Sequence, residues 1–91
     1  MALKALLLRK RLDGKQKELE ALRAKTEEFE TREAELTAAI EETETDEQRS
    51  EVEEMVDSFE AEKEGHGEAV SALEREIEAI ENELAAEEAA Q

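Results

Sequence analysis

The chain contains one histidine, His66, and a histidine raises the question of a metal or proton-transfer site. Zinc sites are built from several cysteine and histidine ligands. Here there is no cysteine and no second histidine, and the neighbouring Glu62 and Glu64 alone make a poor ligand set. The Gly-His-Gly stretch also lacks the lysine and the preceding strand of a phosphate-binding loop. We therefore interpret His66 as a polar residue of a helix core.

Carboxylates are the second candidate chemistry, because Asp and Glu supply 28 of the 91 residues. A catalytic pair of carboxylates needs surroundings that separate the two pKa values in a pocket without water. A chain with 44% charged residues and only two aromatic residues cannot enclose such a pocket. We expect the acids to form solvated helix faces, and we predict no enzymatic activity, no cofactor and no metal.

The basic residues are concentrated at the N-terminus. Residues 1–25 carry eight basic and three acidic side chains, a net charge of +5, whereas residues 26–91 have a net charge of −21. A basic segment can bind phosphates, but this one has no aromatic residue for stacking on bases, and the acidic remainder repels nucleic acid. Lysine and arginine surround its leucines, unlike in a membrane-surface helix. We predict neither nucleic-acid nor membrane binding, and expect this segment to pair with the acidic C-terminal part.

The N-terminus does not read as a targeting segment. Arg9, Lys10 and Arg11 interrupt its apolar run, and no small-residue cleavage site follows, as a secretory signal would require. No stretch approaches the roughly 18 apolar residues of a membrane span. The absence of cysteine is compatible with a reducing compartment. We expect an intracellular, soluble protein.

The elements that position these residues follow from composition and periodicity. A bias to Ala, Glu, Lys, Leu and Arg is typical of long helices, although low hydrophobicity and high charge also occur in disordered chains. Periodicity favours the helices, because 22 positions alternate in steps of three and four and 16 of them are apolar, including Phe29 and Phe59. The predicted seam contains Leu8, Leu12, Leu19, Leu22, Leu36, Ile40, Val52, Val56, Val70, Leu73, Ile77, Ile80 and Leu84.

The two runs of heptads are separated by a stretch without apolar residues, Glu41–Glu51. Thr45 and Gln48 have the spacing of a capping box, with two acids in the first turn that follows. We therefore predict an all-α fold and one domain over residues 1–91, an antiparallel two-helix coiled-coil hairpin. Helix 1 covers about 2–42, the turn about 43–45 and helix 2 about 46–88.

The register of the hairpin is predicted by the polar residues of the seam. Pairing positions whose numbers sum to 92 places Leu19 against Leu73 and Thr26 against His66, and brings Glu33 within one layer of Lys63. Polar core positions that meet each other favour one register over its slips. Two chains in a parallel coiled coil would instead bring lysine against lysine and glutamate against glutamate.

Helix 2 contains Gly65 and Gly67 on either side of His66. Each glycine costs a helix interior about 1 kcal/mol relative to alanine. The neighbouring seam layers are the polar ones. We expect a kink or hinge at Gly65, His66 and Gly67.

Three leucines fall outside the seam, on the opposite side of helix 1: Leu3, Leu6 and Leu7. A monomer would expose them as an apolar patch. A two-helix rod is also marginal alone, because ordering the backbone costs about 1–2 kcal/mol per residue. We predict self-association through this patch.

The stretch "LKALLLRKRLDGKQKELEALRAKTEEFETREAELTAAIEE", the threonine- and acid-rich turn and the second acidic helix carry a family resemblance. They resemble the N-terminal scaffolding segment (delta domain) of tailed-bacteriophage major capsid proteins of the Hong Kong 97 type. The resemblance covers nearly all 91 residues, and "KALLLRKRLD" is its most distinctive part. The Gly-His-Gly interruption departs from the uninterrupted helix expected of the family.

The resemblance implies a function that composition does not. Such segments precede the capsid fold, help subunits assemble into an immature shell, and are then removed by the maturation protease. It therefore implies homo-oligomers, with capsid subunits of the same parent chain and the protease as partners. It places the chain inside the immature capsid in the host bacterial cytoplasm, with an α/β shell domain after residue 91. Neither a cleavage site nor an oligomer number follows from it.

Two other functions are left open by the residues. One is a generic coiled-coil spacer or adaptor of a larger intracellular protein. The other is a nucleic-acid-binding arm like the tRNA-binding hairpin of seryl-tRNA synthetase, which needs basic residues along an exposed face. The acidic turn and second helix of this chain disfavour the arm.

Overall fold

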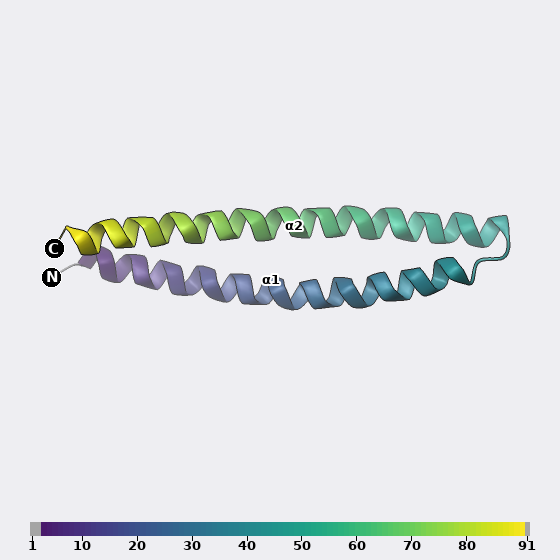
Figure 1. Cartoon of the computed structure of the whole chain (residues 1–91), viewed down its shortest axis with the longest axis horizontal. Helices are drawn as coiled ribbons and strands as arrows, with labels where there is room; N and C mark the ends of the chain where they lie inside the picture. Colours follow the sequence, from purple (N-terminus) through teal and green to yellow (C-terminus); the bar gives the residue numbers. More distant parts are fainter. Residues whose placement is uncertain (1–2, 91) are drawn as a thin grey trace.

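A computed structural model describes residues 3–90 and contains two long helices, α1 (Leu3–Glu41) and α2 (Asp46–Ala89), packed antiparallel (Figure 1). The rod measures 69 × 15 × 14 Å, and both chain ends lie at the same end of it, which we call the open end. The turn lies at the other, closed end. The predicted all-α helical hairpin is confirmed. Residue 2, where helix 1 was expected to begin, lies outside the described residues, as do residues 1 and 91.

Helix formation follows from the local sequence. No proline is present, and Ala, Glu, Leu, Lys and Arg are strong helix formers. The start of α2 is the predicted capping box: the Gln48 N–H donates to Thr45 Oγ1 at 3.1 Å, and Gln48 Oε1 accepts from the Thr45 N–H at 3.2 Å. Asp46 and Glu47 occupy the first turn, where the helix dipole favours negative charge. The capping box therefore determines where α2 begins.

The end of α1 is completed by the turn itself. The Thr43 hydroxyl donates to the Ile40 carbonyl at 2.8 Å, and the Glu42 N–H donates to the Ala38 carbonyl at 3.1 Å. These bonds satisfy carbonyl groups that a helix end otherwise leaves without partners. The Glu44 N–H donates to Gln48 Oε1 at 2.8 Å, so the turn is bonded to both helices.

The apolar core is concentrated toward the open end. We divide the rod into an open half, residues 3–25 and 67–89, and a closed half, residues 26–66. Six of the seven buried side chains of residues 3–90 lie in the open half and only Phe59 in the closed half. The open-half residues are Ala5, Leu8, Leu19, Leu73, Ile77 and Ile80. Leu12, Leu22 and Val70 pack against the cluster formed by Leu19, Leu73 and Ile77.

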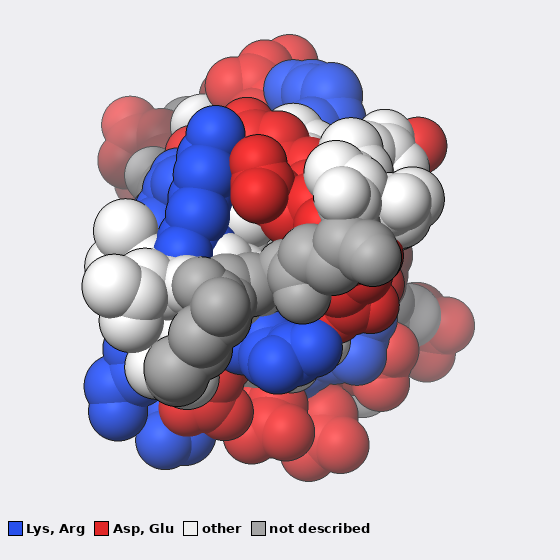
Figure 2. Space-filling view, turned by 90° about the vertical axis from the view of Figure 1, so that its left-hand side faces the viewer, with Lys and Arg blue, Asp and Glu red and all other residues white. Residues whose placement is uncertain are grey.

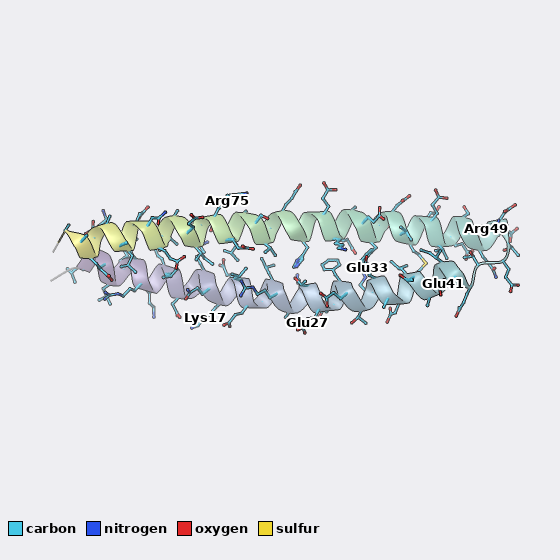
Figure 3. The ribbon with its side chains drawn as sticks, viewed as in Figure 1. Lys17, Glu27, Glu33, Glu41, Arg49 and Arg75 are labelled. Atoms are coloured by element: carbon cyan, nitrogen blue, oxygen red, sulfur yellow. The ribbon has the colours of Figure 1, made fainter. Side chains whose placement is uncertain are left out.

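The predicted register is present at the polar layer. Thr26 Oγ1 lies 2.8 Å from His66 Nε2, and the Lys63 ammonium lies 3.4 Å from the Glu33 carboxylate. In Figure 3 Glu33 lies between the two helices, whereas Glu27 on the same helix points outward. The Thr26–His66 layer is the border between the two halves.

The kink predicted at Gly65, His66 and Gly67 is not present, whereas the hinge predicted at these residues stays a prediction. α2 continues as an α-helix through Gly65, His66 and Gly67, and its ribbon is unbroken there (Figure 1). A glycine in a helix interior lowers stability but leaves every backbone hydrogen bond intact, whereas a proline removes one. His66 lies between the glycines and is anchored to α1 by Thr26 and by the Phe29 ring, 5.0 Å away between centroids. The contacts of His66 therefore offset the low helix propensity of its neighbours.

Neither α1 nor α2, over the part of the chain that the structure describes, contains a stretch long and apolar enough to cross a membrane.

Candidate association surfaces

The leucines left outside the seam form the most exposed apolar surface of the rod. Leu3, Leu6 and Leu7 are 70%, 54% and 61% exposed, whereas the adjacent Ala5 and Leu8 are buried. The first turns of α1 carry leucines on the face turned away from α2 as well as on the seam. We call Leu3, Leu6 and Leu7 the leucine patch.

The surroundings of the leucine patch are basic. Arg9 and Lys10, together with Asp13, line a shallow depression with the three leucines. Asp13 is paired with Lys17 at 3.2 Å, so its charge is compensated within α1. Figure 2, which looks onto the open end, shows lysine and arginine side chains beside uncharged and acidic ones.

Ion pairs between the helices use part of this basic segment, as the charge division predicts. Lys4 pairs with Glu87 at 3.3 Å and Arg9 pairs with Glu88 at 2.5 Å. Among residues 3–90, no ion pair involves Lys10. Lys10 therefore provides positive charge next to the leucine patch that the hairpin itself does not use.

Lys15 occupies a seam position and shows how a lysine is accommodated there. Its ammonium lies 2.9 Å from the Glu76 carboxylate and 3.7 Å from that of Glu18. The hydrogen bond to Glu76, followed by the charge of Glu18, raises the pKa of Lys15 above its ordinary value of 10.5. This seam position is thus filled by an interhelical ion pair in place of an apolar contact.

The structure places most of the predicted seam residues between the helices. Leu8, Leu19, Leu73, Ile77 and Ile80 are buried, and those that are half-buried are Leu12, Leu22, Leu36, Val52, Val56, Val70 and Leu84.

Ile40 departs from the predicted seam, because it is 50% exposed. Its neighbour Ala39 is half-buried instead. Ile40 lies one residue before the end of α1, at the closed end of the rod, so no further turn of α1 covers it on that side.

The closed half contains an aromatic and cationic cluster that periodicity did not predict. The Phe29 and Phe59 rings lie 5.9 Å apart, and the Arg32 guanidinium lies 5.4 and 5.2 Å from their centroids. Arg32 also pairs with Glu62 at 2.6 Å. One sequence feature could have predicted this cluster: Phe29 and Arg32 are three residues apart and therefore lie on the same helix face.

A second apolar surface lies near the closed end and was also missed. Met55 is 54% exposed and, with Leu36 and Ala39, forms the apolar floor of a shallow groove between α1 and α2. The carboxylates that line this groove are those of Glu35, Glu51 and Glu54. Arg32 also reaches it, but its charge is engaged by Glu62. We call this surface the acidic groove.

The remaining chemistry is limited. Within residues 3–90, no group of three or more histidine, aspartate or glutamate side chains is arranged to bind a metal ion. His66 is half-buried against Thr26 and Phe29, in the packing role that we assigned to it. Among residues 3–90, the large apolar side chains that are more than half exposed lie in the leucine patch and the acidic groove.

Comparisons with known proteins found no matching protein-family model, no matching curated protein and no matching solved structure.

Proposed function

We propose that this chain is a non-enzymatic self-association module, a rigid helical hairpin that joins copies of itself through its open end. The observation that carries the proposal is the leucine patch. Three leucines more than half exposed lie next to one another on a rod whose other leucines are at least half buried. Burying apolar surface gains roughly 25 cal/mol per Å², so a second molecule that covers the patch stabilises the assembly.

The shape of the chain supports a structural role. A rod 69 Å long and about 15 Å wide separates its two ends by several times its thickness. The contacts between α1 and α2, both apolar and ionic, keep that separation constant. Such an element positions other molecules at a defined distance.

The resemblance to the delta domain makes the proposal more specific. In that form the module helps phage capsid subunits of the same parent chain to assemble into an immature shell. It is then removed by the maturation protease. Its location is the shell interior, in the cytoplasm of the host bacterium. Once shell subunits share an assembly, weak contacts between their modules act at high effective concentration.

A generic spacer or adaptor is the main alternative, and it requires no self-association. A nucleic-acid-binding arm is the second alternative. The closed half carries three basic and 17 acidic residues, and such a surface repels phosphates.

The test is sedimentation velocity of the full chain over a concentration series. We expect concentration-dependent association, and expect the triple variant Leu3→Gln, Leu6→Gln and Leu7→Gln to lower the mass while far-UV circular dichroism stays helical. Ile40→Gln is the matched control, because it removes an exposed apolar side chain from the other end and should leave the mass unchanged. A wild-type chain that stays monomeric throughout would favour the spacer. A salt-sensitive mobility shift with RNA or DNA would favour the arm.

A further inference from the structure

The surface that covers the leucine patch can be identified from the charges at the two ends of the rod. Five large apolar side chains of residues 3–90 are strongly exposed, and they divide between the ends. The leucine patch lies at the open end. Met55, which lines the acidic groove, lies near the closed end, as does Ile40, which does not line the groove. Each end therefore offers an apolar surface that the hairpin itself does not cover.

The charges around these two surfaces are opposite. Residues 3–11, which contain the leucine patch, include four basic residues and no acidic residue. Residues 32–58, which contain the acidic groove, include 11 acidic residues and two basic ones, Arg32 and Arg49. Arg32 is paired with Glu62 at 2.6 Å. Arg49 is paired with Asp46 at 2.7 Å, in the first turn of α2. The acidic groove therefore has charge complementary to that of the leucine patch.

Pairing two leucine patches with each other is disfavoured by the same charges. A two-fold contact brings the same surface of both molecules together, so Lys10 and Arg11 would approach their own copies. Like charges at close range repel, while opposite charges steer association and select the partner. The acidic groove also offers an apolar floor, formed by Leu36, Ala39 and Met55, that exposed leucines can contact.

We propose that the leucine patch of one copy docks in the acidic groove of a second copy, so that the hairpins associate head to tail. The proposal rests on the self-association proposed above and names the surface that the patch contacts. Leu6 and Leu7 cover Met55, Leu36 and Ala39, while Lys10 faces the carboxylates of the groove rim. Each molecule retains a free surface of either kind, so the contact propagates into rings or filaments.

The contact is weak by its size. Three leucines and their basic neighbours cannot supply the roughly 800 Å² per partner that a standard interface buries. Association therefore depends on concentration, and salt weakens it because part of it is electrostatic. It becomes fully occupied where many copies are kept together by another part of an assembly.

A mixing experiment separates head-to-tail contact from the alternatives. The open-end variant carries Leu3→Gln, Leu6→Gln and Leu7→Gln, and the closed-end variant carries Met55→Glu. All these side chains are exposed, so both variants should keep wild-type helicity. We expect each variant alone to be monomeric where the wild type associates. We expect their equimolar mixture to form heterodimers and nothing larger, because only one intact interface is then available.

Charge exchange tests the orientation of the contact. Lys10→Glu should weaken association at least tenfold. Mixing this variant with a second chain that carries Glu54→Lys should restore association. Glu60→Lys is the matched control, because it changes the net charge equally but lies outside the groove lining. It should not restore association.

Other outcomes overturn the proposal in distinguishable ways. If the closed-end variant associates like the wild type and mixing adds nothing, the leucine patches pair with each other; head-to-tail docking is then wrong but self-association stands. If the wild type stays monomeric at every concentration, both proposals fail. Flotation of the monomeric wild type with anionic phospholipid vesicles, lost in the open-end variant, would then identify a lipid surface as the occupant.

Discussion

In the open half of the rod, six apolar side chains are buried between the helices, and in the closed half only Phe59 is. The charge of the two halves differs as well. The open half has nine basic and 11 acidic residues, whereas the closed half has three basic and 17 acidic residues. The open half therefore combines apolar burial with compensated charge. The closed half packs an aromatic pair, half-buried aliphatic residues and much uncompensated negative charge. One continuous pair of helices thus contains a strongly and a weakly stabilised segment.

The difference shows that helical periodicity does not by itself set local stability. Both halves follow the same alternation of three and four, and both are helical throughout. Local stability depends on which side chains occupy the seam and on how completely they are buried. Because stability varies along a structure, we expect the closed half to exchange its amide hydrogens faster than the open half. Three sets of substitutions test this comparison.

The largest effect is expected from removing one leucine from each half of α1. Leu19 is 8% exposed in the open half, and Leu36 is half-buried in the closed half. Leu19→Ala should lower the free energy of unfolding by about 2–3 kcal/mol, because it leaves a cavity in the main cluster. Leu36→Ala should cost roughly half as much, since its side chain already contacts water. Urea denaturation measures both, and equal losses would contradict the division into two halves.

A smaller, opposite effect is expected at the border between the halves. A methyl group added at Gly65 or Gly67 meets no atom within 4 Å, and both residues are helical. Gly65→Ala and Gly67→Ala should each raise the free energy of unfolding by about 0.5–1 kcal/mol, because alanine loses less chain entropy in a helix. Thermal unfolding followed by circular dichroism measures the gain. A loss of stability would show that α2 needs flexibility here, and would support the predicted hinge.

The smallest effect is expected at the lysine of the open-half seam. Glu76→Gln removes the hydrogen-bonding partner that raises the pKa of Lys15. A raised pKa in the folded state means that the pair stabilises the hairpin below pH 10.5 and ceases to do so as the pH rises beyond the folded-state pKa. The variant should therefore melt slightly lower than the wild type at neutral pH and low salt. A melting difference that persists at high pH or in concentrated salt would show that lost packing, and not the ion pair, is responsible.

The sequence predicted the architecture because local and long-range signals agreed. The alternation of three and four identified the seam, Thr45 and Gln48 identified the start of α2, and the Thr26–His66 pair identified the register. Each signal depends on residue types at fixed spacing, which a sequence displays directly.

The features that the sequence did not predict correctly have separate physical causes. Glycine propensity overstated the disturbance near His66, because the contacts that His66 makes with α1 are invisible in a local window. Ile40 fits the heptad count, but it lies one residue before the end of α1, and a count of spacings does not show where the interhelical contacts end. The acidic groove joins residues of both helices, so neither helix alone displays it. No single-sequence pattern marks Met55 as part of such a surface.

Both chain ends leave the rod at its open end, and this has a mechanical consequence. A force pulling the two ends apart loads the interhelical layers one at a time, so the hairpin unzips and is not sheared as a whole. The first layers to bear the load contain Ala5 and Leu8, among the most completely buried residues. Beyond the Thr26–His66 layer the resisting force should drop and the closed half should open abruptly. The best-buried interhelical contacts thus lie where a pulling force would act first. The hairpin should therefore stay closed until the force exceeds a threshold.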